Sequence, residues 1–138
     1  MAQQNFAALR AAAVDGRTRN GFFRKEQLQK LHNSLATEAS AIQEAIVTSS
    51  SCTPAEAKIE YSLALEEVKQ RFVELDTTKE LVDEYAIARK TNASNLRVGA
   101  GIVIIQPTSH TLFYSTVTPL SSAIAAGNCV ILQVSDSY

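Results

Sequence analysis

The pattern of apolar and polar residues changes near residue 97. In the first part, apolar residues recur every three or four positions over residues 20–47, and again from Tyr61 to Leu75. This spacing predicts two long amphipathic helices, the second of which begins at Thr53–Glu56. Thr53 and Glu56 have capping-box spacing, with proline at the first helical position. The two stripes predict a long antiparallel helix hairpin, with shorter helices over residues 6–14 and from Thr77 onward.

Beyond the turn-like residues 92–95, short continuous apolar runs replace the helical period. The runs Ile102–Ile105 and Cys129–Leu132 are typical of strands that are buried on both faces. Residues 111–126 between them predict a helix, kinked or restarted at Pro119, that ends at Gly127. The sequence therefore predicts an α/β protein. Residues 1–97 form an N-terminal helical layer and residues 98–138 a truncated Rossmann-like βαβ unit, together a single compact domain.

Composition narrows the classes of function. The chain has 138 residues, of which 46% are hydrophobic, and a net charge of −1. A net charge this close to zero gives the chain no general electrostatic attraction for nucleic acid or an anionic membrane. No apolar run is long enough to cross a bilayer. Cys52 and Cys129 form neither a disulfide framework nor a CxxC metal pair. We therefore expect a reduced, cytoplasmic protein without a metal site.

The charges are distributed unevenly along the chain. All 13 lysines and arginines lie at or before Arg97, and Asp136 is the single acid among the 41 residues that follow it. A segment with one charged side chain cannot supply a solvated surface on all sides. A two-stranded parallel sheet also leaves two edges and two faces to cover. We therefore expect a homo-oligomer, a dimer or a larger closed assembly.

Four segments resemble one known family. Gly16–Arg19 reads GRTR and Pro54–Ala57 reads PAEA, and both resemble N-terminal motifs of aldehyde dehydrogenases. Arg97–Val103 resembles the family's R-x-P-x-G-V-V. Thr116–Leu132 resembles its T-x-x-P-L-x-x-A-I-A-A-G-N-x-V-x-L, which is the most specific match. The chain is identified as a member of the aldehyde dehydrogenase superfamily, most similar to the fatty-aldehyde branch and covering only the N-terminal portion, without the catalytic domain.

The resemblance implies that dehydrogenase chemistry is absent. In the family, the cysteine nucleophile, the glutamate base and the glycine turn at the cofactor lie downstream of the matched portion. The family's W-N-Y-P falls on residues 109–112, so its oxyanion-binding asparagine corresponds to His110. The family's K-P-S-E falls on residues 133–136, so its ribose-binding lysine corresponds to Gln133. We therefore expect no dehydrogenase activity and no nicotinamide cofactor.

Two functions remain open. In the first, the protein performs cofactor-independent acid/base chemistry, of the isomerase, cyclase or lyase type, on a small and largely apolar metabolite. Its site would lie at the carboxyl end of the first strand. There His110 and Asp136 are the candidate catalytic residues, and Thr108, Ser109 and Tyr114 are the candidate substrate-binding residues. In the second, the chain is a non-catalytic subunit or partner of a full-length aldehyde dehydrogenase.

Overall fold

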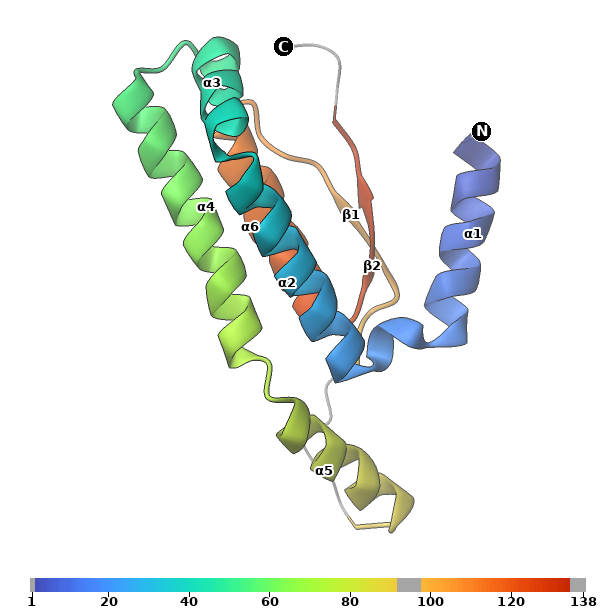
Figure 1. Cartoon of the computed structure of the whole chain (residues 1–138). Helices are drawn as coiled ribbons and strands as arrows, with labels where there is room; N and C mark the ends of the chain where they lie inside the picture. Colours follow the sequence, from blue (N-terminus) through green and yellow to red (C-terminus); the bar gives the residue numbers. More distant parts are fainter. Residues whose placement is uncertain (1, 92–97, 135–138) are drawn as a thin grey trace.

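The structure is a computed structural model that describes residues 2–91 and 98–134, with side chains from Phe6 onward (Figure 1). It is mostly helical, with one small parallel sheet, which is consistent with the expected α/β class. The elements are α1 (Ala2–Asp15), the 3₁₀ turn η1 (Arg17–Arg19), α2 (Gly21–Thr37), α3 (Ala39–Ser50), α4 (Pro54–Glu74), α5 (Thr77–Ala88), β1 (Ile102–Ile105), α6 (Leu112–Ala125) and β2 (Cys129–Leu132).

The first long helix is divided into α2 and α3, contrary to the single helix that the apolar stripe predicts. The division falls at Glu38, whose φ of −95° and ψ of 20° lie outside the α-helical range. Just before it, the Thr37 hydroxyl donates to the carbonyl of Asn33 at 2.9 Å. Such bonds compete with the backbone ladder and bend helices. Asn20 caps the start of α2 as expected, because its side chain accepts from the amides of Phe22 and Phe23.

The second long helix begins where the sequence predicts. Thr53 accepts a hydrogen bond from the Glu56 amide at 3.3 Å, and Glu56 accepts one from the Thr53 amide at 2.8 Å, which completes the capping box. α4 then runs beside α2 and α3, and together they form the predicted hairpin (Figure 1). The next helix, α5, begins at Thr77, and Asp76 caps it by accepting from the amides of Thr78 and Lys79.

β1, α6 and β2 form one βαβ unit, in which both strands have the predicted bounds and the helix is one residue shorter at each end. The strands are parallel, and Ile102 pairs with Cys129 while Ile105 pairs with Leu132. α6 is one helix that contains Pro119, so the restarted helix that we considered is not observed. Gly127 ends it with φ +79°, a conformation that favours glycine. The amides of Gly127 and Asn128 donate to Ile124 and Ala123, which is a Schellman motif.

α6 lies at the centre of the molecule. It packs against α4 and α2 on one side and against both strands on the other (Figure 1). Val68 of α4 and Val117 of α6 are buried together with Ala64, and Phe113 and Leu35 pack around them. A second buried cluster joins Ile46, Ala57 and Tyr61. α1 contacts the strands, yet Ile104 in β1 remains 63% exposed, so part of the sheet is uncovered.

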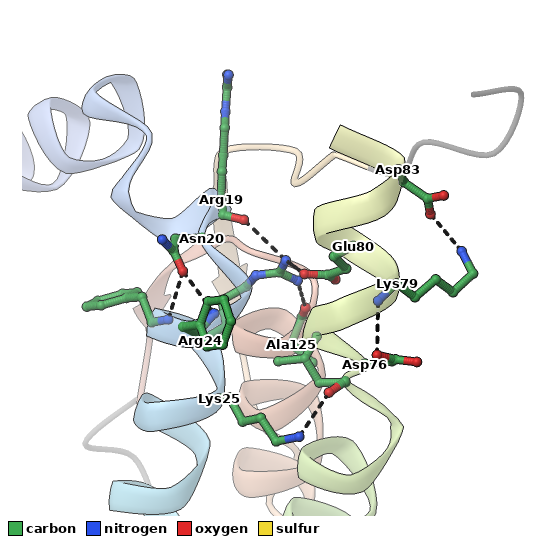
Figure 2. A network of polar contacts seen from close by, with 12 residues as sticks. Arg19, Asn20, Arg24, Lys25, Asp76, Lys79, Glu80, Asp83 and Ala125 are labelled. Carbon is green, nitrogen blue, oxygen red and sulfur yellow. Dashed lines mark hydrogen bonds and ion pairs between the residues drawn. The ribbon is translucent and has the colours of Figure 1, made fainter. Parts of the chain in front are cut away.

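Arg24 joins three helices at one end of the hairpin (Figure 2). Its guanidinium donates to the carbonyl of Ala125 at the end of α6, pairs with Glu80 of α5, and donates to the carbonyl of Arg19 at 3.2 Å. Only 11% of its side chain is exposed. Beside it, Lys25 donates to the carbonyl of Leu75 at 3.2 Å. This junction holds α2, α5 and α6 in fixed relative positions.

Candidate functional site

A cavity of about 560 Å³ lies between α4 and the segment that joins β1 to α6. Its volume falls within the range that small-molecule sites usually have. We call it the α4–α6 cavity. Its lining residues come from the end of α3, the loop before α4, the first half of α4 and residues 109–114: Ser49, Ser50, Cys52, Glu56, Ile59, Glu60, Leu63, Ser109, His110, Thr111 and Tyr114.

Residues 108–111 form a tight turn around the main chain of His110. The hydroxyls of Thr108 and Thr111 each donate to the His110 carbonyl at 2.6 Å. Thr111 has φ 53° and ψ 52°, a left-handed conformation that is strained for a β-branched residue. The Thr108 amide donates to the Ser115 hydroxyl at 3.2 Å, which ties the turn to the first turn of α6. Strain of this kind persists only where the surroundings determine the conformation.

Glu60 closes the N-terminus of α6 from a neighbouring helix. The cap position, Thr111, makes no side-chain capping bond. Instead, the Glu60 carboxylate accepts from the Tyr114 amide at 3.0 Å across 54 residues of sequence. The amides in the first turn of a helix have no intrahelical partner and carry partial positive charge, so a carboxylate stabilises them. Glu60 therefore fixes α6, and with it the His110 turn, against α4.

Glu56 brings a second carboxylate to the α4–α6 cavity. The amide and the hydroxyl of Thr53 both donate to one of its oxygens, each at 2.8 Å. These two bonds hold the pKa of Glu56 below its usual value because they favour the charged form, and the bond from the backbone amide has the larger effect. The Glu56 carboxylate that lines this cavity is therefore kept ionised.

Ile59 and Leu63 supply the apolar wall. They are one helical turn apart on α4, and they are 60% and 55% exposed although both are large aliphatic side chains. Cys52 also lines the cavity and is half-buried. Tyr61 lies on the buried face of α4, and its ring stacks on Phe113 with centroids 6.0 Å apart. The α4–α6 cavity thus combines an exposed aliphatic wall with polar groups from two chain segments.

The structure brings together most of the candidate residues of the sequence analysis. Ser109, His110 and Tyr114 all line the α4–α6 cavity, at the carboxyl end of β1. Thr108 does not line it, and its hydroxyl bonds the His110 carbonyl instead. Asp136, the candidate partner of His110, lies outside the described residues. Among the described residues, Glu56 and Glu60 are the carboxylates that share this cavity with His110.

Sequence reasoning missed the contribution of α4. Glu56, Ile59, Glu60 and Leu63 follow one another at spacings of three, one and three, and so lie on one face of the helix. This face is distinct from the buried face that carries Ala57, Tyr61, Ala64 and Val68. The exposed stripe was a detectable signal. Its proximity to His110 was not, because it depends on how α6 packs against α4.

Two structural findings concern possible metal ligands and the position of Gln133. Among residues 2–91 and 98–134, no three His, Cys, Asp or Glu side chains cluster as metal ligands. Gln133, which aligns with the family's ribose-binding lysine, is exposed and carries no charge. Its backbone amide donates to the carbonyl of Ile105 at 2.9 Å. No described helix has both the length and the apolar character of a membrane span.

A helical layer packed on a parallel βαβ unit, with a cavity at the carboxyl end of the first strand, defines an α/β protein with a candidate ligand site. The chain is 32% identical over 136 residues to "Aldehyde dehydrogenase, dimeric NADP-preferring" of Rattus norvegicus, covering 92% of this chain and 29% of that protein. It is 32% identical over 138 residues to aldehyde dehydrogenase family 3 member B1 of Mus musculus, and 33% identical over 132 residues to that of Bos taurus. Each of these two matches covers 93% of this chain and 28% of the relative.

These matches confirm the resemblance to aldehyde dehydrogenases that the motifs of the chain predict. The chain spans about three tenths of the length of the curated relatives that it matches. No family model matches the chain, and neither does any solved structure.

Proposed function

We propose that this chain binds a small, largely apolar molecule in the α4–α6 cavity and that His110 exchanges a proton with it, without a nicotinamide cofactor. The observation that carries the proposal is the joint position of Ser109, His110 and Tyr114 in one cavity of about 560 Å³. Aliphatic side chains form one wall of this cavity. As part of the proposal, β1, α6 and β2 are a Rossmann-like unit whose carboxyl end carries the site.

Each polar group has a defined part in the proposed reaction. A neutral imidazole at His110 removes a proton from a carbon next to a carbonyl group, and the resulting imidazolium returns it to another atom of the same molecule. The net reaction is an isomerisation, so atoms and electrons balance without a second reactant. Hydroxyl groups of Ser109 and Tyr114 donate to the carbonyl oxygen, where negative charge develops. Glu60 orients this arrangement through the Tyr114 amide.

Solvent exchange tests this proposal without knowledge of the natural substrate. The protein is incubated in D₂O with a panel of small ketones and aldehydes, and ¹H NMR follows loss of the signals from protons next to the carbonyl. We expect wild-type protein to accelerate exchange for at least one compound. The variant His110→Ala should lose this acceleration while its circular dichroism spectrum stays unchanged.

The other histidine of the chain supplies the matched control. His32 lies on α2 and does not line the α4–α6 cavity, so His32→Ala should exchange protons as fast as wild type. Equal loss in both histidine variants would point to damage to the fold. Absence of exchange in the wild-type protein over the whole panel, or retention of exchange in His110→Ala, would refute the acid/base role.

The exposed part of the sheet favours a second candidate function, a non-catalytic subunit that assembles with itself or with a longer aldehyde dehydrogenase. Ile104 and Leu132, in β1 and β2, are 63% and 44% exposed. One of the relatives is named as dimeric. Light scattering would reveal a homo-oligomer, and co-purification with a family 3 aldehyde dehydrogenase would reveal the mixed assembly. A monomer that binds no such dehydrogenase would refute this candidate.

A further inference from the structure

The charged groups of the α4–α6 cavity all have the same sign. Its described lining residues include Glu56 and Glu60, but no lysine or arginine. Lys58 is on the same helix between them and is exposed, and it does not line this cavity. Because the pKa of Glu56 is lowered by its bonds to Thr53, that carboxylate stays charged well below neutral pH. The cavity therefore presents a negative field to a ligand.

The N-terminus of α6 does not reverse this preference. Helix N-termini attract anions because their first amides are unpaired. Here Glu60 already supplies the anion, since its carboxylate accepts from the Tyr114 amide at 3.0 Å. A ligand carboxylate would have to displace Glu60 from α6, or lie beside it at a repulsive distance. Either arrangement disfavours fatty acids and other anionic ligands.

The aliphatic wall defines the rest of the ligand. Ile59 lies between Glu56 and Glu60 along the chain, and Leu63 lies one turn beyond it. Their exposed fractions of 60% and 55% leave aliphatic surface that a hydrocarbon chain can cover. A cation placed at the two carboxylates would direct its apolar part along Ile59 and Leu63. The polar and apolar features of the cavity thus suit opposite ends of one molecule.

We propose that the ligand of the α4–α6 cavity is an amphiphilic amine, in which a protonated amino group contacts Glu56 and Glu60 and an apolar chain covers Ile59 and Leu63. This inference rests on the proposed function, because it adds a protonated amino group to the carbonyl compound that the same cavity takes. It adds that the site selects a cationic ligand over a neutral or an anionic one of equal size.

Three probes with one hydrocarbon chain test the charge preference. Hexylamine, 1-hexanol and hexanoate are titrated into ¹⁵N-labelled protein at neutral pH, and two-dimensional NMR follows the amides of Tyr114 and Ile59. We expect hexylamine to bind about tenfold more tightly than hexanol, since a charge-assisted bond adds roughly 1.4 kcal/mol, which is a factor of ten. Hexanoate should bind most weakly. Added salt should reduce the difference between the amine and the alcohol.

Substitutions on α4 test whether Glu60 causes the preference for the amine over the alcohol. Glu60→Gln keeps an acceptor for the Tyr114 amide and removes the charge, so it should lower the ratio of amine to alcohol affinity several-fold. Glu66→Gln is the matched control, because Glu66 is exposed on the same helix outside this cavity. It should leave the ratio unchanged. Because the three probes are compared on wild-type protein, the inference stays testable even if Glu60→Gln folds poorly.

The outcomes separate this inference from the function on which it rests. If hexanol or hexanoate binds at Tyr114 as tightly as hexylamine, the amine preference is refuted while the small-molecule site stands. If the affinity ratio falls equally in Glu60→Gln and Glu66→Gln, a general surface charge effect replaces the proposed contact. If none of the three probes perturbs these amides, the amine preference is refuted, and the proposed function also fails if no ketone or aldehyde of the panel shows accelerated exchange.

Discussion

Removal of two methyl groups from the contact between α4 and α6 tests the packing that positions the cavity. Val68 is fully buried on α4 and belongs to the cluster that includes Val117 of α6. Val73 lies five residues further along the same helix and is 69% exposed. The substitutions Val68→Ala and Val73→Ala remove the same atoms and change helix propensity equally. The difference between the two variants therefore measures burial alone.

The magnitude follows from the buried volume. Two buried carbon groups contribute about 0.8 kcal/mol each, and the space left behind adds a further cost, so Val68→Ala should lower the free energy of unfolding by about 2–3 kcal/mol. Val73→Ala should change it by less than about 0.5 kcal/mol. For a chain of 138 residues, an unfolding entropy of about 2.1 cal/mol/K per residue converts 2–3 kcal/mol into a fall of about 7–10 °C in Tm.

Urea unfolding followed by circular dichroism measures both variants, and differential scanning calorimetry measures Tm. The slope with denaturant should stay the same in both, because neither substitution changes the surface that unfolding exposes by much. If Val68→Ala proves no more destabilising than Val73→Ala, then Val68 is not buried in solution. The packing of α6 on α4, and with it the α4–α6 cavity, would then be wrong.

Three further predictions concern the same region. Glu60→Ala should cost about 1 kcal/mol in urea unfolding, because the N-terminus of α6 loses its acceptor, and Glu60→Gln should retain most of that stability. The pKa of Glu56 is lowered in the folded state, so the ionised carboxylate stabilises the fold fully above the ordinary pKa of 4.5. This stabilisation is lost as the pH falls further and the carboxylate becomes protonated. The difference in urea midpoint between wild type and Glu56→Gln should therefore shrink between about pH 5 and about pH 3. Gly99→Ala should lower Tm and cost about 1–3 kcal/mol, because an added Cβ would lie 2.5 Å from the carbonyl oxygen of Gly127.

The elements with local signals were predictable from the sequence. Capping by Asn20 and by Thr53 with Glu56 depends on side chains within three residues of the amides they accept from, and both caps form. Gly127 ends α6 for the same kind of local reason, because its left-handed conformation favours glycine. The division at Glu38 was not predicted, because neither glycine nor proline marks it and the apolar stripe continues through it. A hydrogen bond from Thr37 to the chain one turn earlier leaves no trace in the hydrophobic period.

The candidate site was predictable only in its β1–α6 half. The carboxyl end of a parallel strand is a usual place for a ligand, so Ser109, His110 and Tyr114 could be named from the chain alone. The half that α4 supplies depends on a contact over 54 residues of sequence, between Glu60 and the amide of Tyr114. The sequence shows an unexplained stripe on α4, and only the packing of α6 explains it. For this reason the sequence did not reveal that Glu56 and Glu60 line the same cavity as His110.

Arg24 shows the same limit for the fold as a whole. In the sequence it is one basic residue in the first turn of a helix, where a positive charge is unfavourable with respect to the helix dipole. In the structure its guanidinium bonds Ala125, 101 residues away, and Glu80, 56 residues away. The carbonyl of Ala125 lies at the C-terminal end of α6, where a cation is favoured. Arg24 therefore caps the C-terminal end of α6 although it belongs to α2. This long-range contact explains its position, whereas the helix dipole of α2 does not.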